Sequence, residues 1–133
     1  MRMRVSPLIV CLLFATACDE SLTGPTVALN QEFELQPGSA AVIAGASFAL
    51  RFNGVSGDSR CPADAFCIQG GDAIVRVTVV DEGQSREVEL HTGDMRPVQY
   101  DGYTITLVQL QPYPFSSRTI QPDEYRATLK VSR

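Results

Sequence analysis

The chain lacks the residues on which most enzymatic and cofactor chemistry depends. It has no tryptophan, one histidine and four cysteines. No serine stands in a Gly-x-Ser-x-Gly setting, which argues against the nucleophile turn of the α/β-hydrolases. A single histidine and a single cysteine pair beyond residue 18 are too few ligands for a structural zinc site. The sequence therefore predicts a non-enzymatic protein with no cofactor and no metal.

Positive charge is also scarce. Residues 1–17 contain Arg2 and Arg4 but no acidic residue, so their removal changes the net charge from −4 to −6. Proteins that bind nucleic acid need a basic face for the phosphates. We therefore expect no nucleic-acid partner. The 133 residues suffice for one domain with a modest core, and no internal repeat is visible.

The first 17 residues have the pattern of an export signal. Two arginines precede an apolar run over 8–14, which is too short to span a bilayer as a permanent helix. The following Ala-Thr-Ala fits an ordinary cleavage site as well as a bacterial lipobox, but Cys18 directly after it favours the lipobox. We therefore predict that Cys18 is lipid-modified, for example with palmitate. The domain would then lie in the periplasm or outside the cell.

Residues 18–30 predict a flexible tether, because they are mostly polar and are broken by Gly24-Pro25. Residues 31–133 form the predicted single domain. Apolar residues there alternate with period two and no helical stripe appears, which is typical of strands with one buried face. Asp81-Glu82-Gly83 and Asp101-Gly102 are turn signals between such runs.

These features predict an all-β fold, an antiparallel β-sandwich of Ig-like general layout with about seven to nine short strands. A small barrel is the alternative. The expected inward-facing residues are Phe33, Leu35, Phe48, Leu50, Phe52, Ala73, Val75, Val77, Val79, Val88, Leu90, Tyr103, Ile105, Leu107, Tyr125, Ala127, Leu129 and Val131.

The loop expected at residues 54–72 carries two cysteines, Cys61 and Cys67. Their spacing is too wide for a C-x-x-C redox motif, and export favours a disulfide. A reactive, reduced or metal-bound thiol pair is the alternative. Closing so small a loop stabilises the fold by about 2 kcal/mol. We therefore expect the bridge mainly to fix the shape of the loop.

Asp58-Ser59-Arg60-Cys61-Pro62, followed by Cys67-Ile68 and Gly71 to Ala73, resembles a block shared by a group of small uncharacterised bacterial lipoproteins. The group often has tryptophan two residues after the second cysteine, where this chain has Gln69. The match covers this block well and the rest of the chain loosely. The resemblance implies a lipoprotein with a β domain, and it brings no activity with it.

Two groups of side chains invite a chemical interpretation. His91 is a conceivable general base with Asp94 nearby, but the alternation places it on a solvated face with Glu87 and Glu89. The carboxylates that flank the cysteine loop are potential Ca²⁺ ligands, although capping and turn roles are commoner for aspartate. These carboxylates are Asp58, Asp64 and Asp72.

A second long loop at residues 111–122 begins with Pro112-Tyr113-Pro114-Phe115, a segment with two prolines and two aromatics. These aromatics either cover the sandwich edge or contact a partner. Antiparallel strands reverse the chain at each connection, so we expect this loop and the cysteine loop at one end of the sandwich. The predicted interaction surface comprises Arg60, Phe66, Gln69, Tyr113 and Phe115.

The sequence thus favours a non-enzymatic binding or structural module, tethered to a membrane of the cell envelope through Cys18. Its partner would be an envelope protein, a peptide or a glycan, met by loops on a rigid sandwich. The alternative is a small envelope hydrolase that uses His91 and loop carboxylates.

Overall fold

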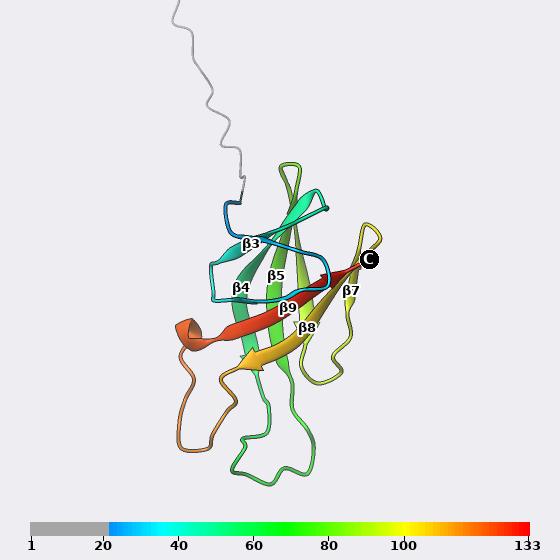
Figure 1. Cartoon of the computed structure of the whole chain (residues 1–133). Helices are drawn as coiled ribbons and strands as arrows, with labels where there is room; N and C mark the ends of the chain where they lie inside the picture. The colour runs from blue at the N-terminus through cyan, green and yellow to red at the C-terminus, as the bar shows by residue number, and fades with distance from the viewer. Residues whose placement is uncertain (1–21) are drawn as a thin grey trace, which may run out of the picture.

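Two β-sheets pack face to face in the computed structural model, which describes residues 22–133 (Figure 1). One sheet has the strand order β1-β3-β4-β5-β6 and the other the order β2-β9-β8-β7. The strands are β1 (Thr26–Val27), β2 (Glu32–Leu35), β3 (Ala40–Ile43), β4 (Phe48–Asp58), β5 (Ala73–Asp81), β6 (Gln84–His91), β7 (Val98–Tyr100), β8 (Tyr103–Gln111) and β9 (Arg126–Ser132), with a short 3-10 helix η1 (Pro122–Glu124) before β9.

The sheets do not close into a barrel, which confirms the predicted sandwich. The predicted export signal and Cys18 lie outside the described residues. Among residues 22–133, no helix has the length and apolar character needed to cross a membrane.

The core lies between the sheets and follows the expected alternation. Every second residue of β5 from Ala73 to Val79 is fully buried, and Leu50 and Phe52 of β4 are equally inaccessible. They pack in one cluster with Ile105 and Leu129 from the opposite sheet. Burial of each large side chain contributes roughly 1.5–3 kcal/mol, so this cluster is the main source of stability.

The alternation breaks at three β-bulges. Two register shifts in β4, between Phe52 and Gly54 and between Val55 and Gly57, keep this strand paired with β5 as far as Asp58. The loop expected at residues 54–72 is therefore shorter, at 59–72, because the bulges keep a glycine-containing segment in the sheet. The third shift, in β8, buries Leu110 instead of Gln109.

The predicted tether is wrong at its C-terminal end. Thr26–Val27 forms β1, which pairs in parallel with β3, and the Asn30 N–H donates to the Val131 carbonyl at 2.8 Å. Gly24 is also packed against the sheet, since a Cβ there would lie 2.1 Å from the Ala40 oxygen. A strand of two residues is too short to show an alternation of apolar and polar residues, so the sequence pattern did not predict β1.

The turns divide between the two ends of the sandwich as the strand alternation predicts. Figure 1 shows the hairpin turn after β5 at one end, near the first described residues, and the long loop between β4 and β5 at the other. We call residues 59–72 the cysteine loop and residues 112–121 the proline loop. Together with the turn at 92–97 they form what we call the paired-loop end.

Candidate functional site

The cysteine loop is closed by the predicted disulfide. Cys61 and Cys67 are bonded with an S–S distance of 2.07 Å and a Cα–Cα distance of 6.0 Å. The two ends of the loop lie close together at Gly71. Only glycine fits there, because a Cβ at this position would lie 1.5 Å from the Ser59 carbonyl oxygen. The loop thus leaves the sheet as a projection that contains a disulfide-closed ring.

Arg60 joins the cysteine loop to the proline loop. Its Nε and Nη2 donate to the two carboxylate oxygens of Asp58 at 2.8 and 2.7 Å. Nη1 donates to the Leu110 carbonyl at 2.9 Å and Nη2 to the Pro112 carbonyl at 3.0 Å. The residue is only 9% exposed. The expectation that Arg60 lies on the interaction surface is therefore wrong. Its side chain is buried by its hydrogen bonds to Asp58 and to the two carbonyls, and it supports that surface from beneath.

Asp58 completes this buried pair. Burial raises the pKa of Asp58, but the hydrogen bonds and charge of Arg60 outweigh burial, so the pKa lies below its ordinary value. The Tyr125 hydroxyl donates to the same carboxylate at 3.0 Å. Burial and this hydrogen bond raise the pKa of Tyr125 to about 12. Asp58 is therefore ionised and fully paired at neutral pH.

A second set of contacts joins the tips of the two loops. The Ala63 N–H donates to the Pro114 carbonyl at 2.8 Å. The carboxylate of Asp64 accepts from the Ser116 N–H at 2.8 Å and from the Ser116 hydroxyl at 2.6 Å. These bonds lower the pKa of Asp64. The two loops, separated by about fifty residues of chain, therefore behave as one unit.

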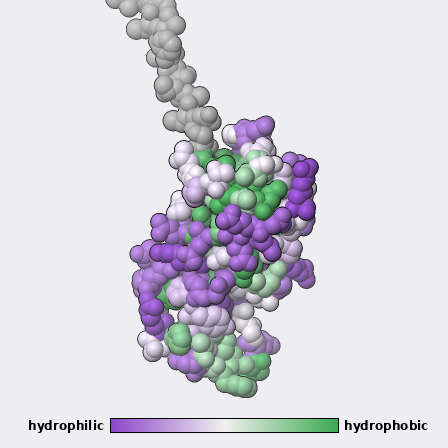
Figure 2. Space-filling view, viewed as in Figure 1, coloured by the Kyte–Doolittle hydropathy of each residue, from purple (hydrophilic) through white to green (hydrophobic). Residues whose placement is uncertain are grey.

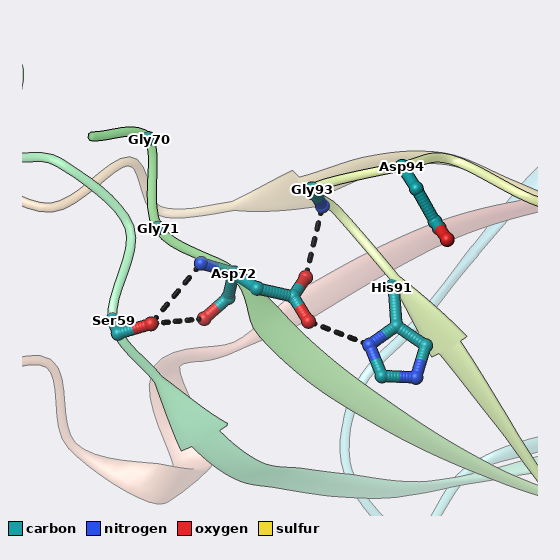
Figure 3. Close-up of a pocket in the computed structure, with 7 residues that line it drawn as sticks. All are labelled: Ser59, Gly70, Gly71, Asp72, His91, Gly93 and Asp94. Carbon is teal, nitrogen blue, oxygen red and sulfur yellow. Dashed lines mark hydrogen bonds and ion pairs between the residues drawn. The ribbon is translucent and has the colours of Figure 1, made fainter.

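His91 faces Asp72 rather than Asp94 (Figure 3). Its Nδ1 lies 2.5 Å from Asp72 Oδ2, and the other oxygen of Asp72 accepts from the Gly93 N–H at 2.8 Å. The hydrogen bond to Asp72 is the main cause that raises the pKa of His91. Burial raises the pKa of Asp72, but the hydrogen bonds to His91 and Gly93 lower it by more. The pKa of Asp72 therefore lies below its ordinary value.

This pair lines an open pocket, and the nearby Thr92 hydroxyl donates to Asp72 Oδ1 at 3.4 Å rather than to the imidazole. Ser59 lines the same pocket, yet its hydroxyl is occupied with the Asp72 backbone, at 3.0 Å from the carbonyl and 3.1 Å from the nitrogen. His91 Nε2 points instead toward Glu89, whose Oε2 is 3.9 Å away. The geometry is that of an oriented histidine, without the serine that would complete a triad.

The three carboxylates that flank the cysteine loop do not converge. Asp58 binds Arg60, Asp64 binds Ser116 and Asp72 binds His91. Within the described part of the chain, no three histidine, cysteine or acidic side chains are grouped to hold a metal ion. Each aspartate instead fixes one part of the paired-loop end.

Exposed apolar side chains gather at this end. Phe66 is 100% and Ile68 99% exposed, and Tyr113, Phe115 and Met95 are about half exposed. Among residues 22–133 these are the only large hydrophobic side chains that are exposed, and Figure 2 shows apolar surface at the lower end of the molecule as well as nearer the top. Gln69 is exposed beside them.

The predicted surface residues Phe66, Gln69, Tyr113 and Phe115 thus lie at one end, and the sequence interpretation missed Ile68 and Met95. Ile68 follows Cys67 directly, and a disulfide loop too small to bury its own apolar residues is the signal that points to it. Beside the base of the loop lies an open groove of about 320 Å³, whose lining includes Met95, Leu110 and Tyr113 as well as Arg60 and Cys61.

Comparison with protein-family models, curated proteins and solved structures finds no match for this chain. The fold and the site therefore define its class by themselves: a two-sheet β-sandwich with a disulfide-closed apolar loop end.

Proposed function

We propose that this protein is a lipid-anchored lipoprotein of the cell envelope whose domain is a non-enzymatic binding module. The paired-loop end is its binding surface. The observation that carries the proposal is the gathering of all large exposed apolar side chains of the described chain at the paired-loop end, where all but Met95 lie on two loops that are braced against each other. Such a patch on a monomer is typical of an interaction site.

Rigidity supports the same function. A disulfide, the buried Asp58–Arg60 pair and the Asp64–Ser116 bonds hold the loops before any partner arrives. Binding then costs little ordering entropy, and the exposed aromatics supply the contact area. The anchor is supported by the Ala-Thr-Ala-Cys18 sequence and by the first described residues, which lie at the end opposite the cysteine loop (Figure 1).

A photo-crosslinking amino acid in place of Tyr113 tests the binding function in intact host cells. We expect a light-dependent adduct of defined mass. The matched control places the same amino acid at Gln84, an exposed position beside the hairpin turn at the other end. No adduct at position 113, or equal adducts at both positions, would contradict the proposal.

A small hydrolase is the second candidate, and the close contact between Asp72 and His91 favours it. A carboxylate that fixes one imidazole nitrogen leaves the other as a base for water. If this were the function, the purified chain would hydrolyse ester or peptide substrates and His91→Gln would abolish that activity. We expect no such activity, because the carboxylates around His91 favour the protonated imidazole, which cannot take a proton from water.

A further inference from the structure

The cysteine loop presents its apolar residues on a convex surface. The complete exposure of Phe66 and Ile68 means that their side chains have no wall of their own protein to rest against. The neighbouring residues on the loop are held by the disulfide and by Asp64, so the loop cannot fold back to cover them. Whatever binds these two side chains must therefore supply the concave surface itself.

The chemistry of the two side chains limits the class of ligand that can bind them. Phenyl and sec-butyl groups offer neither donors nor acceptors, whereas a polar ligand such as a glycan needs hydrogen bonds to replace those it makes with water. The half-exposed Tyr113, Phe115 and Met95 extend the same apolar area around the loop. A protein cleft lined by apolar residues fits this surface.

A second copy of the chain fits less well. Tip-to-tip contact of two convex loops would bury mainly two copies each of Phe66 and Ile68. At about 200 Å² for each large side chain this is roughly 800 Å², below the roughly 1,200 Å² of a stable interface. A cleft that encloses the loop from both sides buries more, because the flanking aromatics then take part.

The bilayer that holds the anchor is also a poor occupant. Gly24 is packed beside Ala40, which pairs with Arg51, and β4 continues to Asp58 before the cysteine loop begins. Those seven steps along β4 span about 23 Å, and Phe66 lies beyond them. Residues 18–24 span at most about 25 Å when fully extended, little more than this part of β4 alone, and the cysteine loop adds to the distance. With Cys18 in the membrane, the domain cannot stand on its cysteine loop.

We propose that the cysteine loop inserts Phe66 and Ile68 into an apolar cleft of a partner protein in the envelope. This inference rests on the proposed binding function. The preformed loop enters the cleft, the disulfide keeps it narrow, and Tyr113 and Phe115 close around the rim.

An environment-sensitive fluorescent amino acid at position 66 of the full-length protein tests this directly. We expect a blue shift of emission with detergent-extracted envelope proteins of the host, lost when those proteins are first digested with protease. A synthetic disulfide-closed peptide of residues 60–69 should reverse the shift, and its linear form with both cysteines replaced by serine should be at least about tenfold weaker. Phe66→Ser in the chain should weaken binding about thirtyfold, as loss of a central aromatic does.

Each other result overturns the proposal in a recognisable way. A shift with protein-free vesicles of host lipids would identify the bilayer as the occupant, and a shift that grows with the chain's own concentration would identify a second copy. A probe that stays in water at position 66 while Tyr113 still crosslinks would leave the binding function standing and remove the cleft. If neither the fluorescence shift at position 66 nor the crosslink from Tyr113 is observed, both the proposed cleft and the proposed binding function are wrong. Phe66→Ser should keep its melting temperature, since the side chain has no contacts to lose.

Discussion

At the scale of single residues, the paired-loop end depends on Arg60. We expect Arg60→Ala to lower the free energy of unfolding by about 3 kcal/mol or more, because it leaves the buried carboxylate of Asp58 without its partner. It also leaves the Leu110 and Pro112 carbonyls without their donor. Urea denaturation of the purified protein measures the change.

The matched control is Arg118→Ala. Arg118 forms an ion pair with Glu124, but its side chain is 58% exposed, so the loss should stay within about 1 kcal/mol. Equal effects of the two substitutions would show that burial does not distinguish these pairs and that Arg60 does not support the loops.

A second prediction at this scale concerns pH and His91. The raised pKa of His91 means that its pairing stabilises the folded state fully below the unfolded pKa of about 6.5. This contribution disappears as the pH rises through the folded pKa. Asp72, Glu89 and Asp94 all favour the charged imidazole, and Arg76 is held by Glu89 and Glu87.

We therefore expect His91→Gln to lower the melting temperature at pH 5.5–6 and to have a smaller effect at pH 8.5. The effect is modest in size, since the side chain is 37% exposed and solvent screens the pair. Thermal denaturation of both proteins across this range gives the comparison. A difference that grows with pH would mean that the imidazole is paired in its neutral form.

At the scale of elements, the disulfide shapes one loop and leaves the sandwich intact. We expect Cys61→Ser with Cys67→Ser to cost about 2 kcal/mol, the value for a very short closed loop, with an unchanged β-sheet circular dichroism spectrum. The crosslink from Tyr113 should weaken at the same time, because the neighbouring loop loses its fixed shape. A variant that loses its sheet spectrum would show that the bridge is required for the whole fold.

The strands were largely predictable because each long strand has one buried face. Leu50 and Val77 fall on that face by simple alternation, and both are fully buried. The extension of β4 to Asp58 was not predictable, since each bulge shifts the alternation by one residue. Likewise β1 has only Val27 in the core, which is too little for any periodic pattern.

The candidate site was predictable in position but not in detail. Counting chain reversals brings the cysteine and proline loops together, and the Ala63–Pro114 bond bears this out. The role of Arg60 was not predictable, because it depends on hydrogen bonds to the backbone carbonyls of Leu110 and Pro112, which a pattern of side chains does not indicate. The Asp72–His91 contact had a usable signal: a two-residue turn at Glu82-Gly83 fixes the register that sets Ile74 opposite His91 and Asp72 close by.

At the scale of the whole molecule, the two ends of the sandwich differ in the loops that they carry. One end carries the hairpin turns after β5 and β7 and lies toward the first described residues, and the other carries the apolar loops (Figures 1 and 2). An anchor at Cys18 would direct the apolar end away from the membrane surface. This orientation is what a binding module needs in order to reach a partner in the surrounding compartment.

The final prediction is that mature protein begins at a lipid-modified Cys18. Arg2 and Arg4, the apolar run at 8–14 and Ala-Thr-Ala before the cysteine fit a lipoprotein signal. Intact mass spectrometry of membrane-extracted protein should show a diacylglycerol adduct on Cys18. Cys18→Ser should move the protein to the soluble fraction, or leave it with an uncleaved signal. Since Cys18 lies before the folded domain, this substitution leaves the paired-loop end itself unchanged. An unmodified, soluble N-terminus in the wild-type protein would contradict the anchor, and with it the geometric argument that the cysteine loop cannot meet its own bilayer.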